Sequence, residues 1–256
     1  MIKIERNNTS FFINENTIFL DWFTKRYPTW EPQTFKVLDD FLVPDKSFID
    51  IGAHIGLVLL YVAPKVKRTI GVECDHVAFD SLEKNVECND FKDRVHLEHA
   101  ALYNSNSEIY VGGGERKAQW GGSGIAITNS DDSRSKKVSG ITIDSLIEKY
   151  DFNDCGLIKI DIEGGEAYVM DNMKGFFESQ KPNMYISIHP HLIDPGKLYH
   201  TISSIFKIFP YVYNTNYELL DQVDTIQDFL MRKIKIGQGL MSSSNGHELI
   251  GTFKEI

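Results

Sequence analysis

The sequence has few cysteines and no basic cluster. Its three cysteines, Cys74, Cys88 and Cys155, form no C-x-x-C pair, so neither a disulfide framework nor a structural zinc site is expected. Lys and Arg number 27 against 36 Asp and Glu, which gives a formal net charge of −9. Proteins that hold a nucleic-acid backbone use clustered Lys and Arg, so a nucleic-acid partner is not expected.

Targeting and membrane segments are also missing. The N-terminal stretch MIKIERNNTSFF has no basic region followed by an apolar stretch and a cleavage site. No apolar run approaches the length of a membrane-spanning helix. We therefore expect a cytoplasmic protein without a membrane partner. With 42% hydrophobic residues, the 256-residue chain can bury the core of one large α/β domain or two small ones.

The most informative segment is FIDIGAHIG, residues 48–56. A short apolar run contains Asp50, Gly52 follows, and Gly56 comes four residues later, with apolar residues at helical spacing behind it. This pattern predicts a buried strand, a tight turn and an amphipathic helix over residues 54–63. Glycine has no Cβ, so the backbone N–H groups of the turn are expected to approach a ligand closely.

The spacing of this turn indicates which kind of nucleoside it binds. A dinucleotide site has G-x-G-x-x-G and a phosphate loop has G-x-x-x-x-G-K-[ST], whereas this chain has D-x-G-x-x-x-G. No Lys or Arg lies between Asp50 and Lys65, and the next apolar run ends in Glu73, where a ribose offers its hydroxyls. An acidic site without basic residues suits a positively charged cofactor without phosphates. S-adenosylmethionine, with a sulfonium, an ammonium and a ribose, fits that description.

Strands and helices alternate along most of the chain, which predicts a mostly parallel sheet with helices on both faces. We expect residues 1–46 to form an N-terminal cap and helix, and residues 47–256 a single catalytic domain. The glycine-rich, polar residues 107–143 break the alternation and are expected to form a hairpin insertion that acts as a lid. The expected strands are residues 47–51, 68–73, 95–99, 156–161 and 184–189. One expected helix begins at Pro32, and four others cover residues 54–63, 76–89, 166–178 and 196–208.

A second motif, LIKIDIEGGE over residues 157–166, runs from a buried strand into three carboxylates around a Gly-Gly turn. In an open α/β sheet the ligand crevice lies at the carboxyl ends of the strands. Carboxylates buried together need a cation, a donor or a proton to compensate them. Asp161 is therefore a strong candidate for a functional residue. Glu163 and Glu166 are weaker ones, because negative charge also suits the start of a helix.

Two histidines follow the next predicted strand. His189 and His191 are two residues apart, so both face one way on an extended strand unless Pro190 turns the chain first. Beside the acidic strand end, a functional role is favoured for His189 over His191. Trp120 and Ser123, in the glycine-rich insertion, either contact an acceptor molecule or merely shape a turn.

Together these motifs resemble the FkbM-type S-adenosylmethionine-dependent methyltransferases. The resemblance covers residues 30–191 and includes WEP, FIDIGAHIG, GVE, HAAL, TID and IKIDIEGGE. It implies a class I methyltransferase fold, which is a Rossmann-like doubly wound sheet of seven strands with the last antiparallel. It also implies methyl transfer to oxygen, often on a sugar or a secondary metabolite. The chain departs from the family at its fifth strand, where Ser187 and His189 replace a frequent acidic residue, and after residue 191.

The expected cofactor site follows from these motifs. Glu73 is expected to accept hydrogen bonds from the ribose, residues 99–101 to lie by the adenine, and Glu31 to reach the amino-acid end. The full set of expected cofactor contacts is Glu31, Asp50, Gly52, Ala53, His54, Gly56, Glu73, Cys74, His99, Ala100, Ala101 and Asp161. The expected acceptor contacts are Trp120, Ser123 and His191.

Two catalytic arrangements remain open, and both use Asp161 and His189. In the first, Asp161, His189 and one of Glu163 or Glu166 hold Mg or Mn, which lowers the pKa of the acceptor hydroxyl. In the second, His189 is the general base and Asp161 orients it. The crowding of carboxylates slightly favours the metal, with Glu163 counted among the catalytic residues.

The function expected from the sequence is O-methylation of a sugar or a nucleotide-linked sugar, in the synthesis of a surface polysaccharide. The alternatives are O-methylation of a non-sugar small molecule or a lipid, and an inactive cofactor-binding fold that serves in an assembly. A homo-oligomer is compatible with the sequence. The sequence does not identify which sugar or which hydroxyl is methylated.

Overall fold

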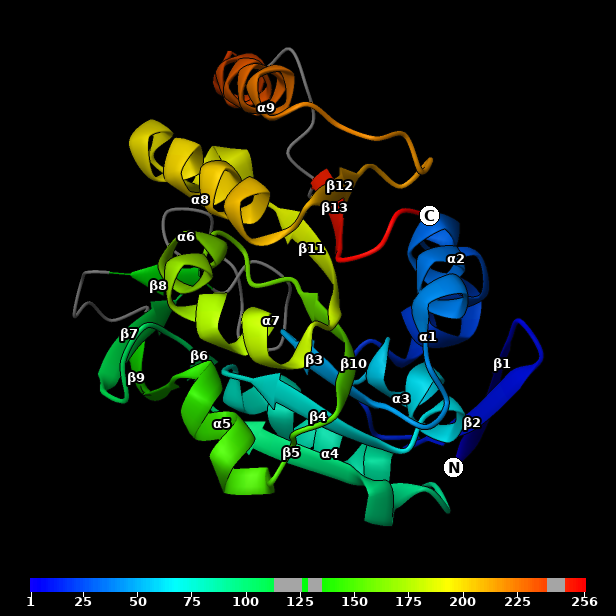
Figure 1. Ribbon diagram of the computed structural model, residues 1–256. Helices are drawn as coiled ribbons and strands as arrows, with labels where there is room; N and C mark the ends of the chain where they lie inside the picture. Colours follow the sequence, from blue (N-terminus) through cyan, green and yellow to red (C-terminus); the bar gives the residue numbers. More distant parts are fainter. Residues whose placement is uncertain (113–125, 129–134, 239–246) are drawn as a thin grey trace.

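The computed structural model describes residues 1–112, 126–128, 135–238 and 247–256 of the chain. Its central sheet has seven strands within these residues, in the order β12-β13-β11-β10-β3-β4-β5 (Figure 1). Strands β5 to β11 of this order run parallel, and β13 runs antiparallel to both of its neighbours. The strands are β3 (Ser47–Ile51), β4 (Arg68–Glu73), β5 (Val95–His99), β10 (Cys155–Ile160), β11 (Asn183–Ile188), β12 (Tyr211–Tyr213) and β13 (His247–Thr252).

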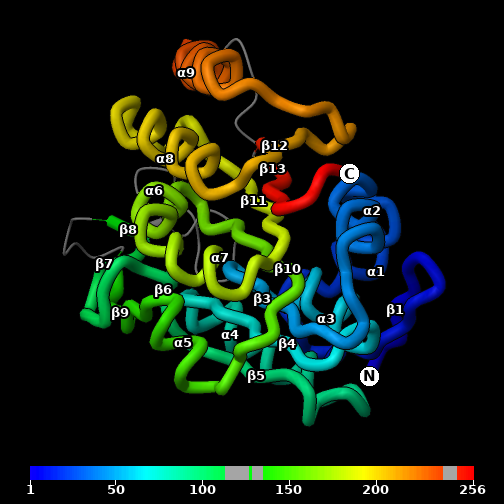
Figure 2. The backbone as a smooth tube through the Cα atoms, viewed as in Figure 1, coloured from blue at the N-terminus to red at the C-terminus, as the bar shows by residue number. Residues whose placement is uncertain are grey.

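Helices cover both faces of this sheet, so the expected α/β architecture with a mixed sheet is confirmed. One face packs against α5 (Ile143–Tyr150), α6 (Glu166–Val169), α7 (Lys174–Gln180), α8 (Pro195–Ile208) and α9 (Gln222–Gly237). The other packs against α1 (Leu20–Lys25), α2 (Pro32–Phe41), α3 (Leu59–Val62) and α4 (His76–Glu87). The backbone trace shows α8 and α9 stacked on the side of β11–β13 (Figure 2). Within the described residues, no helix is long and apolar enough to span a membrane.

Side-chain alternation divides the core between the two faces. Along β11, Met184, Ile186 and Ile188 pack on the side of α7 and α8, while Tyr185 packs on the side of α2. The same alternation along β3 and β10 turns Asp50 and Lys159 toward the α2 side, because residues two apart on a strand share a face. Two polar residues are thereby placed within a largely apolar sheet.

The N-terminal residues contain a hairpin that the sequence pattern did not reveal. Strand β1 (Ile2–Arg6) pairs antiparallel with β2 (Thr9–Ile13), and β2 contacts α3 and α4. The buried Arg6 side chain donates to the carbonyl oxygens of Tyr27 and Trp30, which ties the hairpin to the segment before α2. This segment brings Trp30 to the site described below.

The insertion contributes a second, smaller sheet. Within the described residues its order is β6-β9-β7-β8, formed by β6 (Ala101–Leu102), β7 (Glu108–Gly112), β8 (Ala126–Thr128) and β9 (Ser135–Ile141). Strand β7 pairs antiparallel with both β8 and β9. The insertion therefore connects to the central sheet directly after β5, through β6.

Two expected helices differ from the structure. The segment 54–63 is helical only in α3, and a 3-10 turn at Ala63–Lys65 follows, because Gly56 adopts a φ of +94° and Pro64 interrupts the helix. The segment 166–178 splits into α6, a 3-10 turn at Met170–Met173 and α7. Further 3-10 turns lie at Tyr27–Thr29, Lys92–Arg94 and Pro190–Leu192.

Candidate active site

The turn after β3 is pressed against the end of β10. Gly52 has a φ of +83°, and a Cβ added there would lie 1.9 Å from the carbonyl oxygen of Asp161. The N–H groups of Gly52 and Ala53 both donate to the Val72 carbonyl, at 2.9 and 3.0 Å. The expectation that these N–H groups face a ligand is therefore wrong. Gly52 is required because another strand end occupies the position of its side chain.

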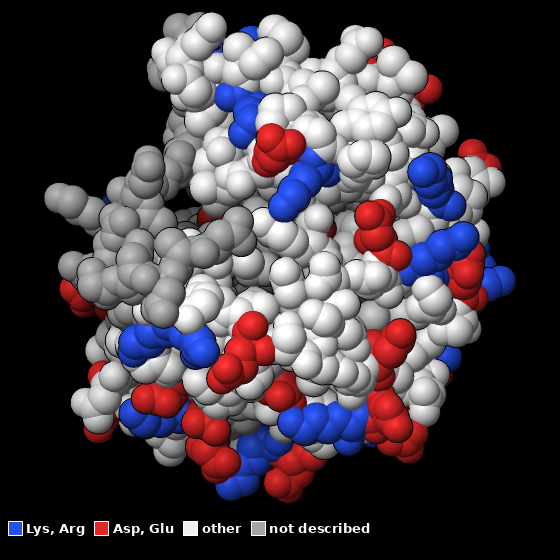
Figure 3. Space-filling model, turned by 90° about the vertical axis from the view of Figure 1, so that its left-hand side faces the viewer, with Lys and Arg blue, Asp and Glu red and all other residues white. Residues whose placement is uncertain are grey.

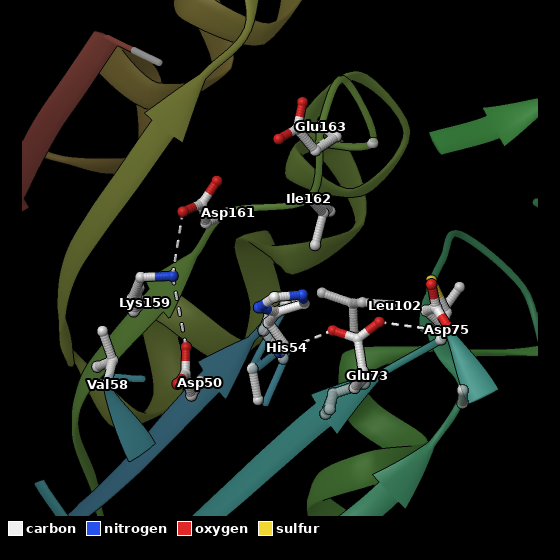
Figure 4. Close-up of a pocket in the computed structure, with 18 of the residues that line it drawn as sticks. Asp50, His54, Val58, Glu73, Asp75, Leu102, Lys159, Asp161, Ile162 and Glu163 are labelled. Atoms are coloured by element: carbon white, nitrogen blue, oxygen red, sulfur yellow. Dashed lines mark hydrogen bonds and ion pairs between the residues drawn. The ribbon is translucent and has the colours of Figure 1, made fainter. Parts of the chain in front are cut away.

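Glu73, at the end of β4, is held by backbone donors on both sides. His54 N–H donates to its Oε2 at 2.8 Å, and Asp75 N–H donates to its Oε1 at 2.7 Å (Figure 4). Burial raises the pKa of Glu73, and these two hydrogen bonds oppose the shift. Each oxygen of a carboxylate accepts more than one hydrogen bond, so Glu73 can still accept from hydroxyl groups in the adjoining pocket.

Three charged residues form a line from β3 to the end of β10. Lys159 Nζ lies 3.5 Å from Asp50 Oδ1 and 3.3 Å from Asp161 Oδ2 (Figure 4). Burial raises the pKa of Asp50 to about 6, although the charge of Lys159 acts against this. Burial would lower the pKa of Lys159, but Asp161 and Asp50 outweigh it and raise the value. Lys159 is therefore a cation between two carboxylates.

Asp161 and His189 meet at the neighbouring strand ends. His189 Nε2 lies 3.7 Å from Asp161 Oδ1 and 3.8 Å from Glu163 Oε2. Burial would raise the pKa of Asp161, but Lys159 and His189 lower it. Glu163, in the turn after β10, has a φ of +51°, in the left-handed region.

The other ring nitrogen of His189 faces a different carboxylate. Nδ1 lies 3.1 Å from Oε1 of Glu166, which is fully buried and also accepts from Ile162 N–H at 3.1 Å. Burial would lower the pKa of His189, but the hydrogen bond to Glu166 and the charges of Glu166, Asp161 and Glu163 raise it to about 9. The expected partner that orients the imidazole was Asp161, and the structure gives that position to Glu166.

The expected metal set was Asp161 and His189 with one of Glu163 or Glu166. Asp161 and Glu163 lie on the Nε2 side of His189, whereas Glu166 lies on the Nδ1 side, so an ion at Nε2 could not also reach Glu166. Among the described residues, no group of three or more His, Cys, Asp and Glu side chains is arranged to hold a metal ion. The contact of Nδ1 with Glu166 is compatible with the second arrangement, in which His189 is the general base.

A pocket at the carboxyl ends of β3, β4 and β10 unites most of the expected cofactor residues. Its lining includes Asp50, Gly52, Ala53, His54, Glu73, Cys74, Ala100, Ala101 and Asp161 from the expected set, together with Glu163. Its apolar lining includes Leu102, Val111 of β7, Ile127 of β8 and Ile162. The described strands of the insertion therefore reach the pocket.

Three expected cofactor contacts lie outside this lining. Gly56 packs against Leu60 and Leu82, and the ring of His99 stacks on Phe79 at 4.6 Å between centroids. Glu31 accepts a hydrogen bond from Thr34 at 3.0 Å, and burial, followed by the charge of Asp161, raises its pKa to about 7. The neighbouring Trp30 lines the pocket in its place.

The expected acceptor contacts are only partly described. The ring of His191, in the 3-10 turn after β11, lies 6.1 Å from the ring of His189 at 74°. Trp120 and Ser123 lie outside the described residues. Their contact with an acceptor stays a prediction.

Sequence reasoning missed Lys159, although the motif contained the signal. Lys159 and Asp161 are two residues apart on a strand and must share a face. A lysine on a buried strand is rare without a charge partner, so Asp161 and the neighbouring Asp50 were the candidates.

Comparisons with known proteins show which family the sequence matches. Residues 50–224 match the methyltransferase FkbM domain. The structure of methyltransferase FkbM from Methylobacillus flagellatus is 19% identical, with a TM-score of 0.40, over 56% of this chain and 32% of that one. This chain thus spans about a third of that protein. A search of curated proteins gave no match.

Two further solved structures are similar at lower identity. Precorrin-6y C5,15-methyltransferase from Geobacter metallireducens is 13% identical, with a TM-score of 0.42, over 80% of this chain and 79% of that one. An RNA methyltransferase from Salinibacter ruber in complex with S-adenosyl-L-homocysteine is 12% identical, with a TM-score of 0.36, over 65% of this chain and 78% of that one.

Proposed function

Because this chain belongs to the FkbM methyltransferase family, we propose that it is an S-adenosylmethionine-dependent O-methyltransferase with a class I fold that methylates a sugar hydroxyl. The sugar would be free or nucleotide-linked and destined for a surface polysaccharide. The observation that supports the proposal best is the His189–Glu166 pair beside the pocket, because deprotonation of a hydroxyl needs an oriented base.

The pocket residues fit the chemical groups of S-adenosylmethionine. The bound cofactor would supply the methyl group as an electrophilic carbon on sulfur. Glu73 would accept hydrogen bonds from its ribose hydroxyls, and the apolar Ala100 and Leu102 suit the adenine face. Asp161, which lines the pocket with its side chain partly exposed, would face the ammonium group.

His189 would accept the proton of the acceptor hydroxyl at Nε2. Its Nδ1–H donates to the Glu166 carboxylate, which fixes the ring and stabilises the imidazolium that forms. Glu163, next to Nε2, would hold the acceptor close to the pocket. An acceptor held in this way reacts far faster than one in solution, because the entropy of orienting it has already been lost on binding.

Surface charge is consistent with a small acceptor. On the face shown in Figure 3, Lys and Arg alternate with Asp and Glu and do not gather into one basic surface. A polyanionic acceptor would need such a surface. We therefore include small sugars and nucleotide-linked sugars in the proposal, and no nucleic acid.

A turnover assay with labelled S-adenosylmethionine tests the proposal. The purified protein would be incubated with panels of free sugars, nucleotide-linked sugars, phenols and lipids, and the methylated product identified by mass spectrometry. We expect methylation at oxygen in the sugar panels. Cofactor binding with methylation confined to phenols or lipids would contradict the sugar assignment. Binding without turnover on any panel would favour the inactive fold.

A further inference from the structure

Lys159 is a buried cation that joins two strand ends at the pocket, and both Lys159 and Asp50 belong to the pocket lining. It lies opposite Asp50 in the parallel pairing of β10 with β3, and only 4% of its surface is exposed. Burial of an unpaired ammonium group is very costly, so this position requires the nearby carboxylates. Glu31, at the start of α2, also faces Lys159 and adds to the negative charge around it.

The two carboxylates beside Lys159 are not equivalent. Asp50 is 1% exposed, and neither of its oxygens accepts a hydrogen bond from the described residues, so the ion pair with Lys159 compensates its charge. The Asp161 side chain is 32% exposed. Its Oδ2 faces Lys159, while its Oδ1 faces His189. Of these two carboxylates, only Asp161 can bind a ligand through one oxygen, Oδ1, while the other, Oδ2, keeps its contact with Lys159.

The backbone of Asp161 is already fixed, whereas its side chain is not. Its N–H donates to the Ile51 carbonyl at 3.0 Å, and its own carbonyl packs on Gly52. The side-chain torsions have no such constraint from the backbone. The contact between Asp161 Oδ2 and Lys159 Nζ constrains these torsions and leaves Oδ1 directed away from Lys159.

We propose that Lys159 is a positioning residue, which orients Asp161 to bind the ammonium group of the cofactor's amino-acid end. Asp50, which lines the pocket but is only 1% exposed, is then the counter-ion that keeps Lys159 in place. This inference rests on the proposed function, since it takes S-adenosylmethionine as the ligand. It reassigns Asp50, which the sequence placed among the cofactor contacts.

Calorimetry on three variants separates the effect of Lys159 on cofactor binding from its effect on the stability of the fold. Lys159→Met leaves Asp50 buried and unpaired, so we expect a lower Tm and at least tenfold weaker binding of S-adenosylhomocysteine, which retains the ammonium group. Asp50→Asn together with Lys159→Met removes the buried pair as a unit, so the Tm should recover while the affinity stays low. Asp50→Asn alone should change the affinity less than threefold. Recovery of both Tm and affinity in the double variant would overturn the proposal.

A truncated ligand provides the second readout. Methylthioadenosine keeps the adenine, ribose and sulfur but lacks the amino-acid end, so its affinity should be the same in the wild type and in the double variant. Equal losses for both ligands would show a general distortion of the pocket and contradict the positioning role. A wild-type protein that binds neither ligand would instead overturn the cofactor assignment, and this inference with it.

Discussion

His189 donates through Nδ1 to Oε1 of Glu166, a carboxylate that no solvent reaches. This contact fixes which ring nitrogen remains for chemistry. Because the Glu166 side chain also accepts from Ile162 N–H, the position of the imidazole depends on the turn that follows β10. His189, which follows β11, is thus oriented by Glu166, the first residue of α6 after β10.

Replacement of Glu166 by Gln should change the pH dependence of turnover. A histidine with a pKa of about 9 is mostly protonated at neutral pH and acts as a base only as the pH rises. Loss of the Glu166 charge lowers that pKa, so the rising limb of kcat should move to lower pH by roughly 1–3 pH units. A kcat–pH profile checks this. The control is Glu178→Gln, an exposed residue of α7, and an unmoved limb would contradict the assigned base.

The same ion pairs should make stability depend on pH. The pKa of His189 is raised in the folded protein, so its contribution is complete below the unfolded value, about 6.5, and is lost as the pH rises through about 9. The Tm should therefore fall over that interval in the wild type. In His189→Asn this part of the decline should be absent. Parallel Tm curves for the two proteins would show that His189 does not carry the effect.

The sequence predicted the strands of the parallel core well. Strands β3, β4 and β5 have the expected bounds; β3 and β4 are short, largely buried runs next to a turn signal, whereas β5 is only partly buried. The hairpin β1–β2 and helix α9 were not predicted. The hairpin gains stability from contacts with other parts of the chain, such as Arg6 with Tyr27, which the local sequence does not show.

The sequence indicated which residues lie at the site more reliably than it indicated what each of them does. Asp161, Glu73 and Ala100 were placed correctly at the pocket, because residues that end parallel strands meet at one edge of a sheet. Lys159 was missed although its spacing to Asp161 was present in the sequence, whereas the metal set depends on which side of His189 each carboxylate occupies. Such distances between strands are set by register and rotamer, which the sequence alone does not give.

Substitution of Gly52 by Ala should destabilise the protein severely. The added Cβ would overlap the Asp161 carbonyl oxygen at 1.9 Å, and a φ of +83° is itself strained for alanine, at a cost of about 1–3 kcal/mol before the clash. Gly175→Ala is the matched control, because nothing lies within 4 Å of that position in α7 and alanine favours helices by up to about 1 kcal/mol. Chemical denaturation of both variants measures the difference. Similar stability would mean that the two strand ends are not in contact.

Chelation should leave the activity intact. His189 has its Nδ1 hydrogen-bonded to Glu166, and the remaining carboxylates do not form a metal-binding group among the described residues. Turnover should therefore be the same before and after dialysis against EDTA. Activity that disappears with EDTA and returns with Mg or Mn would reverse this conclusion and restore the metal-assisted alternative.

Replacement of Glu73 by Gln should weaken cofactor binding without unfolding the site. Gln keeps an oxygen that can accept from His54 N–H, so the turn after β3 should survive, whereas its NH2 group cannot accept from Asp75 N–H. The lost charge weakens hydrogen bonds to the ribose hydroxyls, each worth roughly 1.5–3 kcal/mol, so the Kd should rise by about 10- to 150-fold. Calorimetry with S-adenosylhomocysteine measures this, with the exposed Glu83→Gln on α4 as control. Methylthioadenosine carries the same ribose and should lose affinity to the same degree. A loss confined to S-adenosylhomocysteine would instead place Glu73 at the amino-acid end of the ligand.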